Sequence, residues 1–178
     1  GYKKLLERSL IACGDKELTH YEEAVERYQD IFRECCMHRV EAYEGIGELL
    51  EFLKSQGIFI AVLSNKPHPR TLDNVQGVFG KGYFDLVYGE REDKGIKKKP
   101  CPDGVWAIAE ELGLSKSEIL YLGDTNTDME TGDNAKVDTV GVTWGFRTRE
   151  ELMAFHPALI ADHPSQVVQY IKDVNGIE

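Results

Sequence analysis

The sequence predicts an α/β fold, a doubly wound parallel (Rossmann-like) sheet that follows an all-helical N-terminal block. Short apolar runs alternate with amphipathic segments from about residue 43 onwards, which is the pattern of successive strand–helix units. The run "IFIAVL" (58–63) is apolar without interruption, as is typical of parallel strands that are buried on both faces. Ligands of such folds bind at the carboxyl ends of the strands.

Length and composition predict a globular protein of one domain with a smaller appendage. The chain has 178 residues, 42% of them hydrophobic, and a net charge of -10. This charge argues against nucleic acid or an anionic membrane as a partner. No apolar run approaches the roughly 20 residues that a bilayer span needs, and the start "GYKKLLERSL" lacks a signal-peptide core. Four cysteines without a C-x-x-C pair predict a reducing, cytoplasmic location.

The N-terminal block, residues 1–40, predicts two helices, over 3–12 and 17–39. In the second, apolar residues recur at spacings of three and four on an otherwise charged segment; they are Ala24, Val25, Tyr28, Ile31, Phe32 and Cys35. No strand is expected before residue 58.

The second block, residues 43–178, predicts alternating strands and helices. A helix from Ile46 to Leu53 precedes Gly57, a residue that commonly follows a helix end. The expected strands cover parts of 58–63, 84–89, 119–123, 139–145 and 158–162. The expected helices lie near 69–76, 103–112, 127–136, 148–155 and 165–174. The charged stretch 90–99 is the long loop of this block, and loops of that length are often functional.

The first polar strand end is Ser64–Pro67, directly after "IFIAVL". A hydroxyl and backbone N–H groups at this place can receive phosphate oxygens. Each of these residues also forms turns readily, so the segment alone leaves a simple turn as an alternative.

The second is the loop Lys97–Asp103. Pro100 pushes Lys99 into an extended conformation and so sets the direction of its ammonium group. We expect Lys97 and Lys98 to be solvated, whereas Lys99 is a candidate site residue. Asp103 is expected to cap the helix that follows.

The third is "YLGDTNTD" (121–128), which carries two aspartates four residues apart. Thr127 and Glu130 fit a capping box, so a helix is expected to start at Asp128, where its dipole would favour the carboxylate. Asp124 follows an apolar strand, where an unpaired charge is costly to desolvate. Mg²⁺ answers that need, because it binds one or two carboxylates, waters and a substrate phosphate.

In order, "AVLSN", "KKKPCPD" and "YLGDTNTD" resemble motifs II, III and IV of the haloacid dehalogenase-like hydrolase superfamily. The stretches "LGDTNTDMETGDNA" and "VGVTWGFRTREEL" are similar to its phosphoglycolate phosphatase-like branch. The match covers residues 43 to 170, and residues 1–40 resemble part of a helical cap. The resemblance implies a cofactor, Mg²⁺, and a small phosphorylated metabolite as substrate.

The resemblance also implies residue roles. Asp124 binds Mg²⁺ directly, and Asp128 holds metal-bound waters or Lys99. Ser64 and the Asn65 backbone contact the phosphoryl group, and Lys99 neutralises charge on it.

Motif I is absent, because the superfamily's D-x-D-G-T nucleophile segment has no counterpart among these residues and no D-x-D occurs. In the superfamily its strand lies between the strands that end at Ser64 and Asp124. We therefore expect the 178 residues to be a C-terminal portion of a longer protein, inactive alone, in which an aspartyl-phosphate intermediate forms.

Two other functions are open. A receiver domain also gathers carboxylates, a hydroxyl group and a lysine around Mg²⁺, but its acidic residues come first and its lysine last, the reverse of the order here. A superfamily-derived binding protein that has lost its nucleophile is the second alternative. The identity of the phosphate ester and the oligomeric state are left open.

Overall fold

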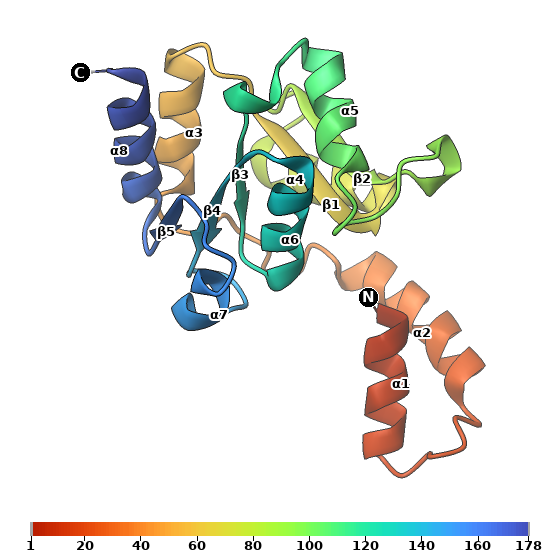
Figure 1. The fold of residues 1–178 in the computed structure, drawn as a ribbon. Helices are drawn as coiled ribbons and strands as arrows, with labels where there is room; N and C mark the ends of the chain where they lie inside the picture. Colours follow the sequence, from red (N-terminus) through yellow and green to blue (C-terminus); the bar gives the residue numbers. More distant parts are fainter. Residues whose placement is uncertain (1, 178) are drawn as a thin grey trace. The chain divides into compact units, whose positions relative to one another are not determined.

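The computed structural model of the chain describes residues 2–177 (Figure 1). It divides into two compact units, one that ends at Glu41 and one that begins at Ala42.

The first unit consists of α1 (Tyr2–Ala12) and α2 (Tyr21–Cys35). Tyr2 stacks on Tyr28 with ring centroids 4.9 Å apart, and Tyr28 stacks on Phe32 at 5.6 Å. Neither helix has a buried residue. Helix α2 begins later than the expected residue 17, because the Asp15 carboxylate accepts hydrogen bonds from the backbone N–H groups of Thr19 and His20 and forms a turn there.

The second unit alternates strands with helices, as the sequence predicts. Its strands are β1 (Ala61–Pro67), β2 (Leu86–Glu90), β3 (Leu120–Gly123), β4 (Asp138–Val142) and β5 (Leu159–Ala161). Its helices are α3 (Ile46–Ser55), α4 (His68–Phe79), α5 (Asp103–Leu112), α6 (Asn126–Ala135), α7 (Arg149–Met153) and α8 (Pro164–Asn175). The ladders between named strands are parallel, so the α/β fold class with parallel strands is confirmed.

The strands form two sheets rather than one. Strand β1 pairs with β2, and β3 pairs with β4, which pairs with β5. Among residues 2–177, β1 and β3 each have one hydrogen-bonded neighbour strand. Four of the five residues of β4 are buried, whereas β1 has none in that class. The hydrogen-bonded sheet is therefore interrupted between β1 and β3.

The main core lies between β4 and β5 and the two helices α3 and α8, which lie side by side in Figure 1. Its buried members are Leu49, Val140, Val142, Ala161, Val167 and Ile171. Because both helices direct apolar residues into one cluster, this core fixes the three-stranded sheet and hence the position of the β3 carboxyl end.

Two expected helix starts are wrong. Helix α6 begins at Asn126 rather than Asp128, because Thr125, not Thr127, is the N-cap and Asp128 is the N3 partner of its capping box. Asp103 is the first residue of α5 rather than its cap, a position held by Pro102. The Asp103 carboxylate instead accepts hydrogen bonds from the Cys101 thiol and the Lys97 backbone.

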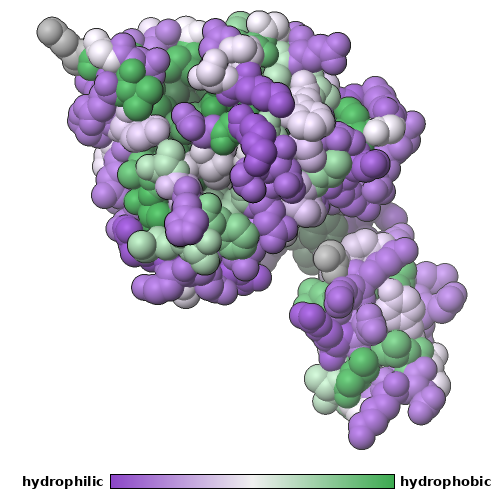
Figure 2. All heavy atoms as spheres, in the orientation of Figure 1, coloured by the Kyte–Doolittle hydropathy of each residue, from purple (hydrophilic) through white to green (hydrophobic). Residues whose placement is uncertain are grey.

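The visible face of the molecule is mainly hydrophilic (Figure 2). Within residues 2–177, no helix combines the length and the apolar character that a membrane span requires.

Candidate active site

Lys99 lies between β1 and the first turn of α6, and its ammonium group contacts both. It donates hydrogen bonds to the Leu63 carbonyl in β1 at 3.2 Å and to Asp128 Oδ1 in α6 at 2.6 Å. The side chains of Lys99 and Asp128 are only 15% and 7% exposed. The structure thus brings together two residues that the sequence places in separate motifs.

Asp128 is surrounded by donors. Its Oδ2 accepts hydrogen bonds from the hydroxyl and the backbone N–H of Thr125, at 2.6 and 3.1 Å. Burial by itself would raise the pKa of Asp128, but the Lys99 ammonium and the donated hydrogen bonds outweigh burial and hold that pKa below its ordinary value. Asp128 is therefore a carboxylate at neutral pH, and its oxygens are occupied by protein donors.

Tyr121 is a site residue that the sequence reasoning missed. Its hydroxyl donates to Asp128 Oδ1 at 3.3 Å, the oxygen that also accepts from Lys99. Burial and the charge of Asp128 raise the pKa of Tyr121 well above its ordinary value, so the hydroxyl keeps its proton. Tyr121 and Asp128 lie seven residues apart in "YLGDTNTD", and this spacing alone does not predict a contact. The strand–turn–helix geometry brings the two side chains together.

Asp124 is held by a loop that the sequence reasoning did not assign to the site. The Phe146 backbone N–H, in the loop after β4, donates to Asp124 Oδ2 at 2.9 Å. At Gly145, an added Cβ would lie 2.1 Å from the same oxygen, so a residue without a side chain is required for this approach. The sequence does place "TWGF" at the end of an expected strand. Because the carboxyl ends of parallel strands lie at one edge of a sheet, this position could have indicated that the segment belongs to the site.

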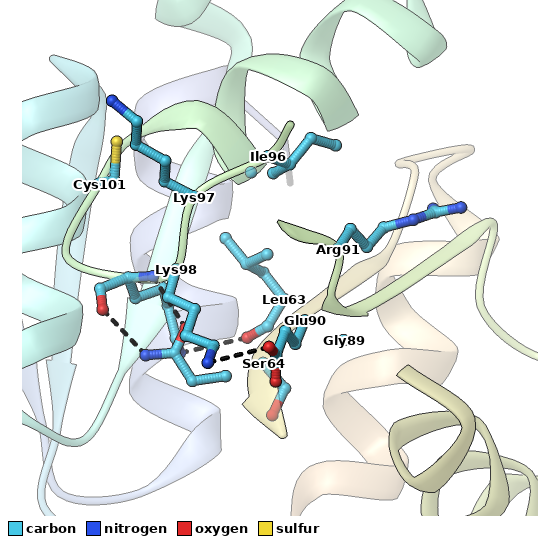
Figure 3. A pocket seen from close by; sticks show the side chains of 12 residues that line it. Leu63, Ser64, Gly89, Glu90, Arg91, Ile96, Lys97, Lys98 and Cys101 are labelled. Carbon is cyan, nitrogen blue, oxygen red and sulfur yellow. Dashed lines mark hydrogen bonds and ion pairs between the residues drawn. The ribbon is translucent and has the colours of Figure 1, made fainter. Parts of the chain in front are cut away.

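Ser64 and the lysine loop face each other at this edge (Figure 3). The Ser64 hydroxyl accepts a hydrogen bond from the Lys66 backbone N–H at 3.1 Å. Lys98, expected to be solvated, forms ion pairs with Glu90 at 2.9 Å and with Glu92 at 3.3 Å. The Lys98 side chain is 41% exposed, so these pairs contribute little to stability, but they tie the loop to the end of β2.

The Asn65 side chain bonds to the backbone of Lys99. Its Nδ2 donates to the Lys99 carbonyl at 2.9 Å, and its Oδ1 accepts from the Lys99 backbone N–H at 2.8 Å. The predicted contact of the Asn65 backbone with phosphate stays a prediction.

The residues present fit part of a Mg²⁺ site. Among residues 2–177, no cluster of three or more His, Cys, Asp or Glu side chains could hold a metal ion. Mg²⁺ does not need such a cluster, because one or two carboxylates with waters and a substrate phosphate suffice. The Asp124 carboxylate accepts one hydrogen bond, from the Phe146 backbone, and is therefore the candidate direct ligand. Nearby, at the start of α6, the buried Asn126 Oδ1 has no hydrogen-bond partner among the described residues.

The cavity beside this edge is small. It is lined by residues of β1, of the end of β2 and of the lysine loop, and its volume is about 10 Å³, which is about the space of one water molecule.

A protein-family comparison finds the haloacid dehalogenase-like hydrolase model over residues 3–142. The chain is 28% identical to a phosphoglycolate phosphatase of Pectobacterium atrosepticum over 96% of its own length and 73% of the relative. It is 27% identical to the pyrophosphatase PpaX of Listeria welshimeri, over 74% of its own length and 59% of the relative.

A crystal structure from Lactobacillus delbrueckii subsp. bulgaricus, of a protein assigned as a phosphoglycolate phosphatase, superposes with a TM-score of 0.79. It is 29% identical in sequence, with 86% of this chain and 63% of that chain covered. The chain thus spans about three fifths to three quarters of the length of these relatives. The family match extends over most of the chain and includes the end of β1, the lysine loop and the end of β3, and the chain belongs to the haloacid dehalogenase-like hydrolase family.

Proposed function

We propose that this chain provides most of the active site of a Mg²⁺-dependent phosphatase that hydrolyses a small phosphate monoester. The observation that carries the proposal is the buried Lys99 ammonium, held between β1 and Asp128 at the strand edge where Ser64 and Asp124 also lie. A fixed ammonium group at this place can stabilise the negative charge that develops on a transferring phosphoryl group.

The proposed roles follow the environments of the side chains. Asp124, held through one oxygen by Phe146, is the ligand for Mg²⁺, which when bound would polarise a phosphoryl oxygen. Asp128, whose oxygens accept hydrogen bonds from protein donors, holds the Lys99 ammonium, which also bonds to β1. Ser64 contributes its hydroxyl to the phosphoryl group.

The interrupted sheet supports a further part of the proposal. Neighbouring strands in a sheet exchange backbone hydrogen bonds, and interior N–H and C=O groups are rarely left unpaired. We propose that one more parallel strand pairs with β1 and β3 and ends in the D-x-D-G-T nucleophile segment, so that the aspartyl-phosphate forms beside Lys99. Residues 1–40 would then be part of the helical cap, and the free cysteines suit a cytoplasmic enzyme.

The substrate is tested with a panel, because the relatives are named for different substrates. Phosphoglycolate comes first, followed by pyrophosphate and sugar phosphates. The assay uses this chain together with an added segment in which an apolar strand is followed by D-x-D-G-T, and it measures released phosphate. Mg²⁺-dependent release is expected only when the segment is present, and not when its first aspartate is changed to asparagine.

Matched variants test the individual roles in that complemented enzyme. Asp124→Asn should abolish turnover, whereas Asp128→Asn should leave part of it. Lys99→Ala should cost on the order of 10²–10³ in rate, and Lys97→Ala should cost far less. If Lys97→Ala were the more damaging of the two, or if Asp124→Asn kept full activity, the assignment would be wrong.

A non-catalytic binding protein is the second candidate function, favoured by the absence of any D-x-D among these residues. It predicts that phosphate and Mg²⁺ bind to the chain but that no added segment restores turnover.

A further inference from the structure

The segment Lys99–Pro100 lies between β1 of the two-stranded sheet and α6, which packs against the three-stranded sheet. The ammonium of Lys99 reaches both Leu63 in β1 and Asp128 in α6. The backbone of the segment is also held from both sides, because Asn65 of β1 bonds to Lys99 and Asn134 of α6 bonds to Pro100. Placement of the ammonium therefore depends on where this short stretch of backbone is fixed.

The Asn65 side chain contacts Lys99 as a neighbouring strand would. Its amide donates to the Lys99 carbonyl at 2.9 Å and accepts from the Lys99 N–H at 2.8 Å. Among the short side chains, only a carboxamide carries a donor nitrogen and a separate acceptor oxygen on one carbon. Aspartate can make only the accepting bond, and alanine can make neither.

The Asn134 side chain forms a single bond to the same segment. Its Nδ2 donates to the Pro100 carbonyl at 2.9 Å. Because Pro100 has no N–H, a two-way contact like that of Asn65 is impossible there. The two asparagines thus form an unequal pair, with the stronger tie on the β1 side.

We infer that Asn65 is a positioning residue, whose side-chain amide fixes the Lys99 backbone so that the ammonium group lies between Leu63 and Asp128. The inference assigns to Asn65 a task different from phosphate contact. The positioning of Lys99 by Asn65 can be measured without turnover. Only the expected effect on catalysis rests on the proposed function of Lys99.

The first readout is the reactivity of the Lys99 amine in this chain. Acylation by a water-soluble amine reagent is followed by peptide mass spectrometry, with Lys97 as the internal reference. In the unmodified protein, Lys99 should react much more slowly than Lys97. In Asn65→Ala, Lys99 should react up to about thirtyfold faster than in the parent protein, the factor that corresponds to the loss of two hydrogen bonds of about 1 kcal/mol each.

Two variants grade the effect. Asn134→Ala removes one bond instead of two and should raise Lys99 reactivity by less than Asn65→Ala. Asn175→Ala removes an amide of the same size that bonds to the Ile171 carbonyl in α8, and it should leave Lys99 reactivity unchanged.

The second readout is hydrogen exchange of the Lys99 backbone N–H, which reports the tie itself. Faster exchange together with faster acylation in Asn65→Ala supports positioning. Faster exchange with unchanged acylation would overturn it, because the amide would then hold the backbone without affecting the ammonium. A rise in the reactivity of all lysines would also overturn it, since that indicates general loosening.

In the complemented enzyme, Asn65→Ala should lower kcat about tenfold with a smaller change in KM, because Lys99 would be misplaced for the transition state. If the complemented enzyme shows no phosphatase activity at all, the proposed function fails, while the acylation and exchange results still decide the role of Asn65.

Discussion

At the scale of single residues, the two aspartates of "GDTNTD" are stabilised in different ways. Asp128 accepts hydrogen bonds from Lys99, Tyr121 and Thr125, so its charge is satisfied within the protein. Asp124 accepts one from the Phe146 backbone, and Mg²⁺ is its proposed further partner. The pair is tolerated because the two like charges have separate partners.

The Asp128–Lys99 pair makes stability depend on pH. The pKa of Asp128 in the folded protein lies below its ordinary value of 3.8. Its stabilisation is therefore fully present above the unfolded-state pKa and is lost as the pH falls through the folded-state pKa. Asp128→Asn should lower the free energy of unfolding by about 3 kcal/mol at pH 7, and the difference should shrink below about pH 4.

Urea unfolding from pH 7 to pH 3 measures this difference. Asp133→Asn is the matched control, because Asp133 pairs with Lys136 at 2.9 Å while both side chains are about 70% exposed. Such surface pairs contribute little, so its effect should be close to zero. An Asp128→Asn loss that stays constant across the whole pH range would contradict the linkage.

At the scale of elements, the site depends on close contact between β3 and the first turn of α6. A Cβ at Gly123 would lie 2.1 Å from the Asp128 Cβ and 2.6 Å from its Cγ. Glycine thus lets the capping-box carboxylate lie directly over the strand end. Helix α6 begins where Thr125 can cap it, and this start places the Asp128 carboxylate within hydrogen-bond distance of the Lys99 ammonium.

Gly123→Ala should therefore lower the free energy of unfolding by about 1–3 kcal/mol, the usual cost of overpacking. Gly47→Ala is the comparison in α3, where an added Cβ meets no atom within 4 Å. It should stabilise the protein by up to about 1 kcal/mol through helix propensity. Urea unfolding of both variants tests the pair, and equal stability of Gly123→Ala and the parent would show that α6 can move away from β3.

At the scale of the whole molecule, the second unit contains a two-stranded and a three-stranded sheet. Strand β4 pairs on both sides, and its last four residues are buried. Strands β1 and β3 pair on one side among the described residues. Among the described strands, β4 is therefore the one for which we expect the strongest protection.

Native-state hydrogen exchange should reflect this difference. Amides of β4 should exchange the most slowly, at rates set by global unfolding, whereas those of β1 and β3 that do not bond to β2 or β4 should exchange by local opening. Adding the proposed strand segment should slow exchange in β1 and β3 by a larger factor than in β4, because it also closes the local openings of these two strands. Equal protection of all three strands without the segment would contradict an interruption of the sheet.

The sequence alone predicted the α/β class and the parallel strands, because apolar runs and helical spacing are local patterns. It also predicted that the strand-end residues lie at one edge, since the carboxyl ends of parallel strands point the same way. The contact of Lys99 with Asp128 agrees with that prediction. The start of α6 was misplaced because Thr125–Asp128 and Thr127–Glu130 both satisfy the capping pattern, and only the end of β3 selects between them.

Only the tertiary structure revealed the contacts of Asn65, Tyr121 and Phe146. Each of the three residues forms a hydrogen bond with a site residue on another segment. The sequence does not specify how far apart those segments lie in space. The break between β1 and β3, in contrast, was already implied by the resemblance, because the motif I strand that would lie between them is missing from these residues. Local patterns determine the type of each element, whereas hydrogen bonding between elements requires atoms to meet within about 3 Å, and only the packed core sets such distances.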